Sequence, residues 1–289
     1  MLDGVFHKLF FFGLSLAVSV FLTSCSQKKD IDISKLGIET ESPEKLYYQG
    51  LANIKAKNLP EAARKFDAVN RISPFSEWAR KSLVMSVFVK YKDAKYNDSI
   101  TTANSYIKQY PRSQDAAYIQ YLIGLCYYNQ INDVTLDQRS AILTIQAMEQ
   151  IINDHPDSEY VKDAKAKLLF AKDQLAGKEM QVGRYYLERR EYLAAISRFR
   201  VVVEKYSTTN QIEEALARLA EAYYAMGIMN EVQVAAAVLH KNYPNSIWYA
   251  DILKLLKSVG LQPDDKFSSW ISKASKKCSF KSSSTNKQC

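Results

Sequence analysis

The sequence predicts an all-α fold, a solenoid of about five helix pairs stacked in chain order. Hydrophobic residues make up 47% of the 289 residues, enough to form a packed core. Only 9 residues are glycine, which disfavours the glycine-rich turns of phosphate- and dinucleotide-binding folds. The strongest observation is a repeated mark, Pro-x-Ser, at residues 74–76, 111–113, 156–158 and 244–246, with a degenerate copy at 207–209.

Residues 1–24 are predicted to be a lipoprotein signal peptide rather than part of the fold. The uncharged, mostly apolar run from Leu9 to Leu22 is too short for a membrane span of about 20 residues but is typical of a signal-peptide core. It leads into small residues followed by Cys25, which resembles the lipobox of bacterial lipoproteins. That resemblance implies lipidation of Cys25, and an ordinary signal peptide with an incidental cysteine is the alternative.

Residues 25–42 are predicted to be a flexible tether from the lipidated cysteine. They contain few large apolar side chains and no helical stripe, and such a chain has a root-mean-square reach of roughly 20–25 Å. Ser26 follows the cysteine where aspartate would favour the inner membrane. By resemblance to lipoprotein sorting patterns, this favours the outer membrane of a Gram-negative envelope.

The solenoid is predicted to cover residues 43–262, with units that begin near residues 43, 80, 117, 176 and 213. Small residues precede a large one at fixed offsets from the marks, as Gly50 and Phe66 do in the first unit and Gly183 and Phe199 in the fourth. Small residues let two helices cross closely, and the large one fills the gap. The arrangement resembles the tetratricopeptide repeat, a helix–turn–helix unit. An irregular helical bundle with incidental prolines is the alternative.

The spacing of the marks predicts where the repeat is interrupted. Two intervals are 37 residues and two are longer, at 45 and 51, against a family period of about 34. We expect the third unit to hold its extra residues between its helices, at 131–138. We expect the fourth unit to begin with a longer helix that starts near Ser158.

Residues 263–289 are predicted to be a short extension followed by a disordered basic tail. The segment 273–289 contains five lysines and no acidic residue, which accounts for most of the formal net charge of +8. Basicity confined to a tail is typical of solvated lysines, so no nucleic-acid partner is expected. Cys278 and Cys289 could form a disulfide in an oxidising periplasm, although no other feature supports the pairing.

The sequence contains no recognisable catalytic or metal-binding motif. His7 leaves with the signal peptide, His155 fills a position that is tyrosine before three other marks, and His240 stands alone on a helix. No H-x-x-x-H, C-x-x-C or G-x-S-x-G pattern occurs. Cys126 is expected to be a small core residue. We therefore expect no enzymatic activity, no metal and no cofactor.

An aromatic peptide-binding groove is predicted on the inner face of the first three units. In tetratricopeptide folds the first helix of each unit lines the inner face, and its positions transferred to this chain give the candidates Tyr47, Phe88, Tyr91, Tyr118 and Tyr121. Aromatic side chains with flanking lysines suit an extended peptide that has aromatic residues and an acidic or carboxylate end. The alternative is that these side chains pack between helices as core residues.

The equivalent positions of the fourth and fifth units are more polar and nearly free of aromatic residues. They are Gly177, Met180, Arg184, Leu187, Glu188, Glu214, Ala217, Glu221, Tyr224 and Ala225. A polar face of this kind suits a folded partner better than an apolar peptide. The two halves of the solenoid are therefore predicted to bind different partners.

The whole set resembles the BamD family, outer-membrane lipoproteins of the β-barrel assembly machinery. The resemblance rests on the lipobox, the five repeats, and the strings YIQYLIGL at 118–125 and AGKEMQVGRYY at 176–186. The second string looks like the α-proteobacterial members. The resemblance implies a scaffold on the periplasmic face of the outer membrane, held there by its lipid anchor.

The resemblance also implies partners. They are the periplasmic domains of the barrel-forming subunit, other assembly lipoproteins, and the C-terminal targeting signals of unfolded barrel proteins, which typically end in an aromatic residue. Arg198 matches, by local resemblance, a family arginine in contact with the barrel subunit, and a solvated surface arginine is the alternative. The alternative function is that of another periplasmic tetratricopeptide lipoprotein, for instance one that coordinates peptidoglycan synthesis.

Overall fold

Every regular element in the described part of the chain is a helix. The computed structural model describes residues 41–266 and 269–274. The predictions for the signal peptide, for Cys25 and most of the tether, and for Cys278 and Cys289 lie outside these residues. The helices are α2 (Pro43–Lys55), α3 (Leu59–Ile72), α4 (Glu77–Lys92), α5 (Tyr96–Gln109), α6 (Ala116–Tyr128), α7 (Arg139–Asp154), α8 (Val161–Glu188), α9 (Tyr192–Lys205), α10 (Ile212–Ala225), α11 (Met229–Asn242) and α12 (Ile247–Ser258).

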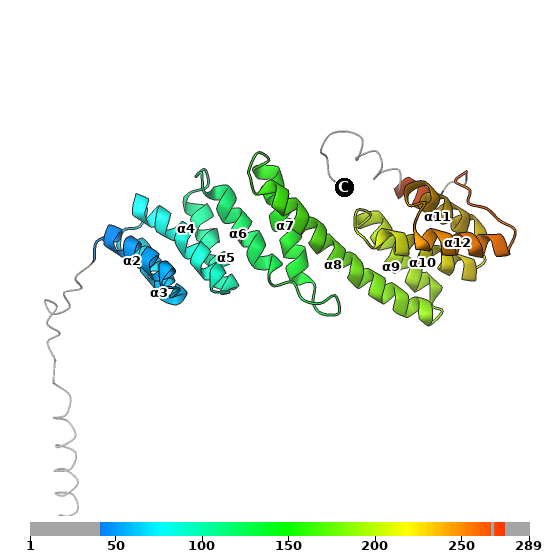
Figure 1. The fold of residues 1–289 in the computed structure, drawn as a ribbon, viewed down its shortest axis with the longest axis horizontal. Coiled ribbons are helices and arrows are strands. Elements are labelled where there is room, and N and C mark those ends of the chain that lie inside the picture. Colours follow the sequence, from blue (N-terminus) through cyan, green and yellow to red (C-terminus); the bar gives the residue numbers. More distant parts are fainter. Residues whose placement is uncertain (1–40, 267–268, 275–289) are drawn as a thin grey trace, which may run out of the picture. The chain divides into compact units, whose positions relative to one another are not determined.

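The helices stack in pairs along the chain (Figure 1). Each helix packs against its chain neighbour, and the first helix of each pair also packs against the first helix of the next: α2 on α4, α4 on α6, α6 on α8, α8 on α10 and α10 on α12. The five pairs begin with α2, α4, α6, α8 and α10, and α12 follows the last pair. The predicted all-α solenoid of helix pairs is confirmed.

Close crossing of the two helices within a pair depends on small residues, as predicted. A Cβ added to Gly50 would lie 2.5 Å from the ring of Phe66, and one added to Gly183 would lie 2.4 Å from the ring of Phe199. Both phenylalanines are fully buried. The glycines therefore let a large ring from the second helix reach the backbone of the first.

The turn inside four of the pairs has the same backbone geometry. The turn residues Lys57, Ala94, Arg190 and Gly227 have φ of 60°, 57°, 62° and 75°. In each turn the following N–H bonds back to the carbonyl five residues earlier, for example Asn58 N to Asn53 O at 2.9 Å. This is the Schellman end of a helix. Only Gly227 is a glycine, so the other three turns adopt the left-handed conformation without the usual residue.

The third and fourth pairs carry the longer segments. Residues 129–138 connect α6 to α7, and α8 has 28 residues, about twice the length of its neighbours. The connection packs on α8, where Lys178 Nζ donates to Thr135 O at 3.1 Å. A Cβ on Gly177 would lie 3.3 Å from Val134 Cγ1. The extra residues thus cover the middle of the long helix.

The chain beyond α12 packs back on the last pairs. Ser269 Oγ donates to Glu231 on α11, and Trp270 Nε1 donates to Tyr223 Oη on α10 at 3.1 Å. Ile271 is fully buried, and the guanidinium of Arg200 lies 4.8 Å from the Trp270 ring. The C-terminal strap, as we call residues 269–274, covers apolar surface at the end of the stack.

None of the helices found between residues 41 and 274, as far as the structure describes them, is long and apolar enough to cross a membrane.

Candidate functional site

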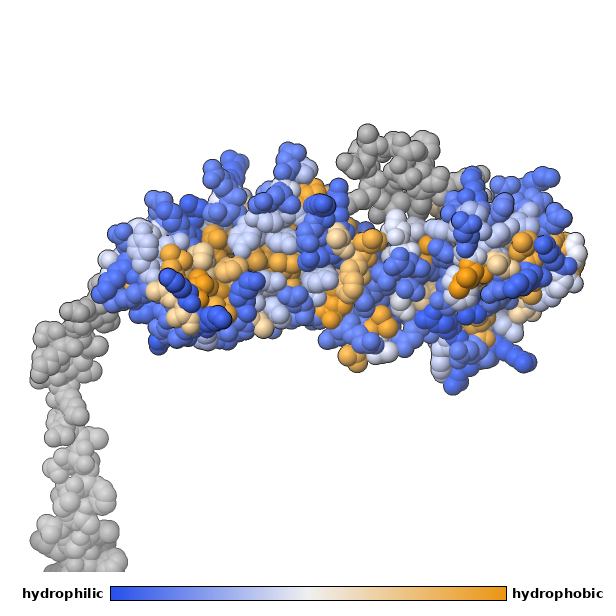
Figure 2. Space-filling model, in the orientation of Figure 1, coloured by the Kyte–Doolittle hydropathy of each residue, from blue (hydrophilic) through white to orange (hydrophobic). Residues whose placement is uncertain are grey.

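The five aromatic residues predicted to line a groove lie on the first helices of the first three pairs. Tyr47 is on α2, Phe88 and Tyr91 are on α4, and Tyr118 and Tyr121 are on α6. All five are half-buried, with one side packed on the core clusters of the first pairs. They are neither fully buried core residues nor free surface side chains. Figure 2 shows apolar side chains at the visible surface in a band over these pairs, bordered by charged ones.

At the α2–α4 junction, Tyr47 belongs to an aromatic cluster. Its ring centroid lies 5.6 Å from Phe66 and 5.4 Å from Trp78 on α4. Lys81 Nζ lies 5.3 Å from the Trp78 ring. Lys81 also pairs with Glu77 at 2.7 Å, so this end of the surface combines edge-on and tilted aromatic rings with an ion pair whose ammonium lies over a ring.

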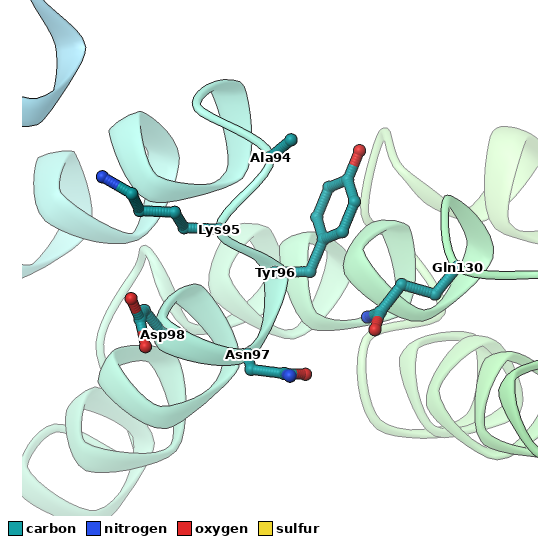
Figure 3. A pocket seen from close by; sticks show the side chains of 6 residues that line it. All are labelled: Ala94, Lys95, Tyr96, Asn97, Asp98 and Gln130. Atoms are coloured by element: carbon teal, nitrogen blue, oxygen red, sulfur yellow. The ribbon is translucent and has the colours of Figure 1, made fainter.

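Lysine and tyrosine also meet at the end of α4. Lys92 Nζ lies 5.7 Å from the Phe88 ring and 5.8 Å from the Tyr91 ring. Asn129 Nδ2 donates to Tyr91 Oη at 3.2 Å. Close by, a shallow pocket of about 290 Å³ is lined by Ala94, Lys95, Tyr96, Asn97, Asp98 and Gln130. Figure 3 shows Tyr96 standing beside Gln130 there, with Lys95 and Asp98 on the other side.

At the α6–α8 junction, the rings of Tyr118 and Tyr121 pack on Tyr160. The centroid distances are 5.6 Å and 4.8 Å, and Tyr121 and Tyr160 are stacked. Tyr121 Oη donates to Asp163 on α8. A pocket of about 500 Å³ opens here, lined by Gln114, Asp115, Ala117, Tyr118, Ser158, Glu159 and Tyr160.

The hydroxyl groups of this cluster stay protonated at neutral pH. Burial raises the pKa of Tyr118, and burial followed by the hydrogen bond to Asp163 raises the pKa of Tyr121. Burial and the hydrogen bond to Glu159 raise the pKa of Tyr160 to about 12. The hydroxyl protons of Tyr121 and Tyr160 are already bonded to carboxylates, so the cluster presents neutral aromatic rings to a peptide rather than free donors.

Two of the aromatic residues at these junctions, Trp78 and Tyr160, escaped the sequence prediction. Both stand two residues after the serine of a Pro-x-Ser mark, as Trp248 does after the last mark. Each contacts the first helix of the preceding pair, and the guanidinium of Arg218 lies 5.0 Å from Trp248. Asp115 holds the same position after the second mark and pairs with Arg80. Their shared position, two residues after the serine of a mark, is the sequence feature that could have predicted these contact residues.

The inner face of the last pairs carries an ion-pair network. Arg184 on α8 binds both oxygens of Glu214 at 2.8 Å, and Arg218 contacts Glu214 at 3.4 Å and Glu221 at 2.8 Å. The prediction of polar surface was wrong at three positions, Gly177, Met180 and Ala217, which are buried. Gly177 faces Val134 of the connection between α6 and α7, and Met180 and Ala217 belong to the core of the last pairs.

Arg198 lies on α9, a second helix, and therefore apart from the aromatic surface of the first helices. Its side chain is 45% exposed and its Nη1 lies 3.3 Å from Glu179 Oε2 on α8. An exposed pair of this length contributes little to stability. The guanidinium is therefore available to a partner at little cost to the fold.

In the part of the chain that the structure describes, the remaining reactive side chains form no site. Cys126 is fully buried, and burial raises the pKa of its thiol. The His240 ring packs on Tyr249 at 5.1 Å. Within residues 41–266 and 269–274, no group of three or more His, Cys, Asp and Glu side chains is placed to hold a metal ion.

Comparisons of the sequence with known proteins agree on one family. The family described as YfiO, outer membrane lipoprotein, matches residues 39–239. The outer membrane protein assembly factor BamD of Caulobacter vibrioides is 40% identical over 225 residues, which cover 78% of this chain and 74% of that protein. BamD of Rickettsia prowazekii is 34% identical over 243 residues, covering 84% and 95%. Among solved structures, the TPR2AB-domain:pHSP90-complex of yeast Sti1 matches with a TM-score of 0.39 and 15% identity, covering 75% of this chain and 84% of that one.

Proposed function

The chain belongs to the BamD family of outer membrane lipoproteins, and from this premise we propose that it is a non-enzymatic scaffold for the assembly of outer-membrane β-barrel proteins. Its inner surface on α2, α4 and α6 binds the C-terminal segments of unfolded barrel proteins. Its second half binds the barrel-forming subunit, with Arg198 in the contact. Other assembly lipoproteins join the same complex.

The observation that carries the proposal is the row of half-buried aromatic residues on three successive first helices. A peptide that ends in an aromatic residue and a carboxylate presents a ring and a negative charge close together. The α4 residues Lys81 and Lys92 each hold an ammonium group within 6 Å of an aromatic ring. The surface therefore offers both features such a peptide end needs, and half-buried tyrosines are frequent energetic centres of interfaces.

The test removes two rings that face different junctions. Tyr91→Ala with Tyr118→Ala should weaken binding of a barrel C-terminal peptide about tenfold or more, because each truncated centre costs upwards of about 1 kcal/mol. Fluorescence anisotropy measures binding, and circular dichroism checks that helicity is unchanged. Tyr185→Ala is the matched control, since this exposed tyrosine lies on α8, away from the row. Equal binding by the double variant, or unfolding of it, would show that the rings belong to the core.

Anchoring is part of the proposal and rests on Cys25. Cys25→Ala should leave the protein unprocessed or move the mature chain to the soluble fraction. A variant that is cleaved and membrane-bound like the parent would contradict lipidation at this residue.

A further inference from the structure

The turn between α3 and α4 differs from the equivalent turns of the solenoid. In the four Pro-x-Ser marks the serine N–H bonds to the carbonyl three residues earlier: Ser76 to Ser73, Ser113 to Tyr110, Ser158 to His155 and Ser246 to Tyr243. The middle residue is Arg112, Asp157 or Asn245 in three of them and Phe75 in the first. Of these four, only Phe75 has a positive φ, 63°, and it is 73% exposed.

The backbone conformation and the exposure of Phe75 both cost free energy in the isolated protein. Proline followed by a positive φ is the pattern of a type II turn, in which glycine or asparagine is the usual third residue. A phenylalanine there is strained, and its ring remains in water. Local strain of this kind is retained where the surroundings or a function require it. Because the exposed ring makes little contact within the fold, we look for a binding partner outside the fold that the ring contacts.

Phe75 is joined by other exposed apolar side chains. Ile72 is 42% exposed and Tyr48 is 55% exposed. Ile72 ends α3 three residues before Phe75, and Tyr48 lies in the middle of α2, against Trp78, which follows Phe75 by three residues. The Tyr48 ring lies 5.9 Å from Trp78. We call Tyr48, Ile72 and Phe75 the apolar corner.

The apolar corner lies where the chain enters the fold. Helix α2 begins at Pro43, and the sequence places only residues 26–42 between it and Cys25. A chain of this length cannot separate its ends by more than about 60 Å. If Cys25 carries the lipid anchor, this end of the solenoid is confined close to the bilayer, at an effective concentration on the order of millimolar. Such tethering lets a small apolar surface contact lipid that it would not bind on its own.

We propose that the apolar corner inserts into the phospholipid surface that holds the lipid anchor. Tyrosine, tryptophan and lysine beside apolar side chains are the composition of membrane–water interfaces, and Lys81 lies over Trp78 next to the corner. The contact fixes how the first helix pair faces the membrane. It depends on lipidation at Cys25, and the corner borders the aromatic row at Trp78 and Lys81.

The test places a photoreactive p-benzoylphenylalanine at position 75 of the full-length, lipidated protein. The protein is anchored in vesicles of phosphatidylethanolamine and phosphatidylglycerol, irradiated, and digested for mass spectrometry of lipid adducts. The matched control carries the same probe at position 245, in the equivalent turn of the last mark. We expect a lipid adduct at position 75 in about tenfold or greater excess over position 245, the ratio that burial of one phenylalanine side chain supports.

A second variant separates insertion from chance proximity. With the probe at position 48, Phe75→Gly should lower the lipid adduct about tenfold, because glycine accepts the positive φ but supplies no ring. Peptide binding by Phe75→Gly should be unchanged. Equal adduct yields at positions 75 and 245 would overturn the proposal. The proposal would also be overturned if the mature chain carried no lipid on Cys25. It would be overturned as well if, in intact envelopes, the probe at position 75 were linked to a protein instead of a lipid.

Discussion

At the scale of single residues, the fit between the two helices of a pair depends on the combined size of two facing side chains. The pairs Gly50–Phe66 and Gly183–Phe199 put a glycine against a ring. The fifth pair has Ala220 and Ala236 at the equivalent positions, both fully buried. A phenylalanine on the second helix therefore requires glycine at the facing position of the first helix. An alanine on the second helix permits alanine there.

Gly183→Ala should consequently destabilise the protein. Alanine is favoured over glycine inside a helix by up to about 1 kcal/mol, but its Cβ would lie 2.4 Å from the Phe199 ring. Overpacking of this kind typically costs about 1–3 kcal/mol, so we expect a net loss in the free energy of unfolding, measured by urea denaturation.

The matched control uses the pairing that the fifth pair already has. Phe199→Ala leaves a cavity and by itself lowers the free energy of unfolding by about 3–5 kcal/mol. In this background Gly183→Ala should be neutral or stabilising. A loss of equal size in both backgrounds would mean that the ring is not the cause.

Single residues also show what the sequence could and could not predict. The offsets from the marks predicted Gly50 and Phe66 correctly, because a close crossing admits few combinations of size. The exposure of Tyr118 and Tyr121 was not predictable. They pack on Tyr160, which lies 39 or more residues further along the chain, beyond α7.

At the scale of elements, a helix cap decides where the second unit begins. Ser76 Oγ accepts a hydrogen bond from Ala79 N at 3.0 Å, so α4 begins at Glu77. The second unit was predicted to begin near residue 80, after the true start of the helix, and Trp78 was therefore left outside it. A serine before a helical segment is an N-cap signal in its own right, and it would have moved the start forward.

The C-terminal strap is an element that the repeat pattern did not contain. Trp270→Ala removes the hydrogen bond to Tyr223 and the stacking on Arg200. We expect a loss of about 1–3 kcal/mol, somewhat below that of a fully buried tryptophan, with faster amide hydrogen exchange in α10 and α11. Truncation after Ala274 keeps the strap and should leave exchange unchanged. Equal exchange in the Trp270 variant and the parent would show that the strap does not stabilise the last pairs.

At the scale of the whole molecule, the inner helices change character along the stack. The first three carry the aromatic row, and α8 and α10 carry the network of Arg184, Glu214, Arg218 and Glu221. Composition at the repeat positions predicted this contrast. It did not predict the pairing of the charges, because pairing depends on the distance between successive first helices.

Arg198 on α9 tests whether the second half binds the barrel-forming subunit. Arg198→Glu reverses the charge and should abolish co-purification of that subunit from solubilised envelopes. Arg198→Lys should weaken it less, since lysine keeps the charge but cannot form two parallel hydrogen bonds to a carboxylate. Peptide binding should be unchanged in both variants. Unchanged co-purification with Arg198→Glu would move the contact elsewhere on the solenoid.

The central claim, recognition of an aromatic peptide end by the first three pairs, is tested most directly by changing the peptide instead of the protein. The affinity of the full chain is measured for one barrel C-terminal sequence that ends in phenylalanine, in alanine, or in phenylalanine amide. The account predicts that the alanine and amide peptides bind about tenfold or more weakly, because one lacks the ring and the other lacks the carboxylate that the lysines attract. Equal affinity for all three peptides would contradict it.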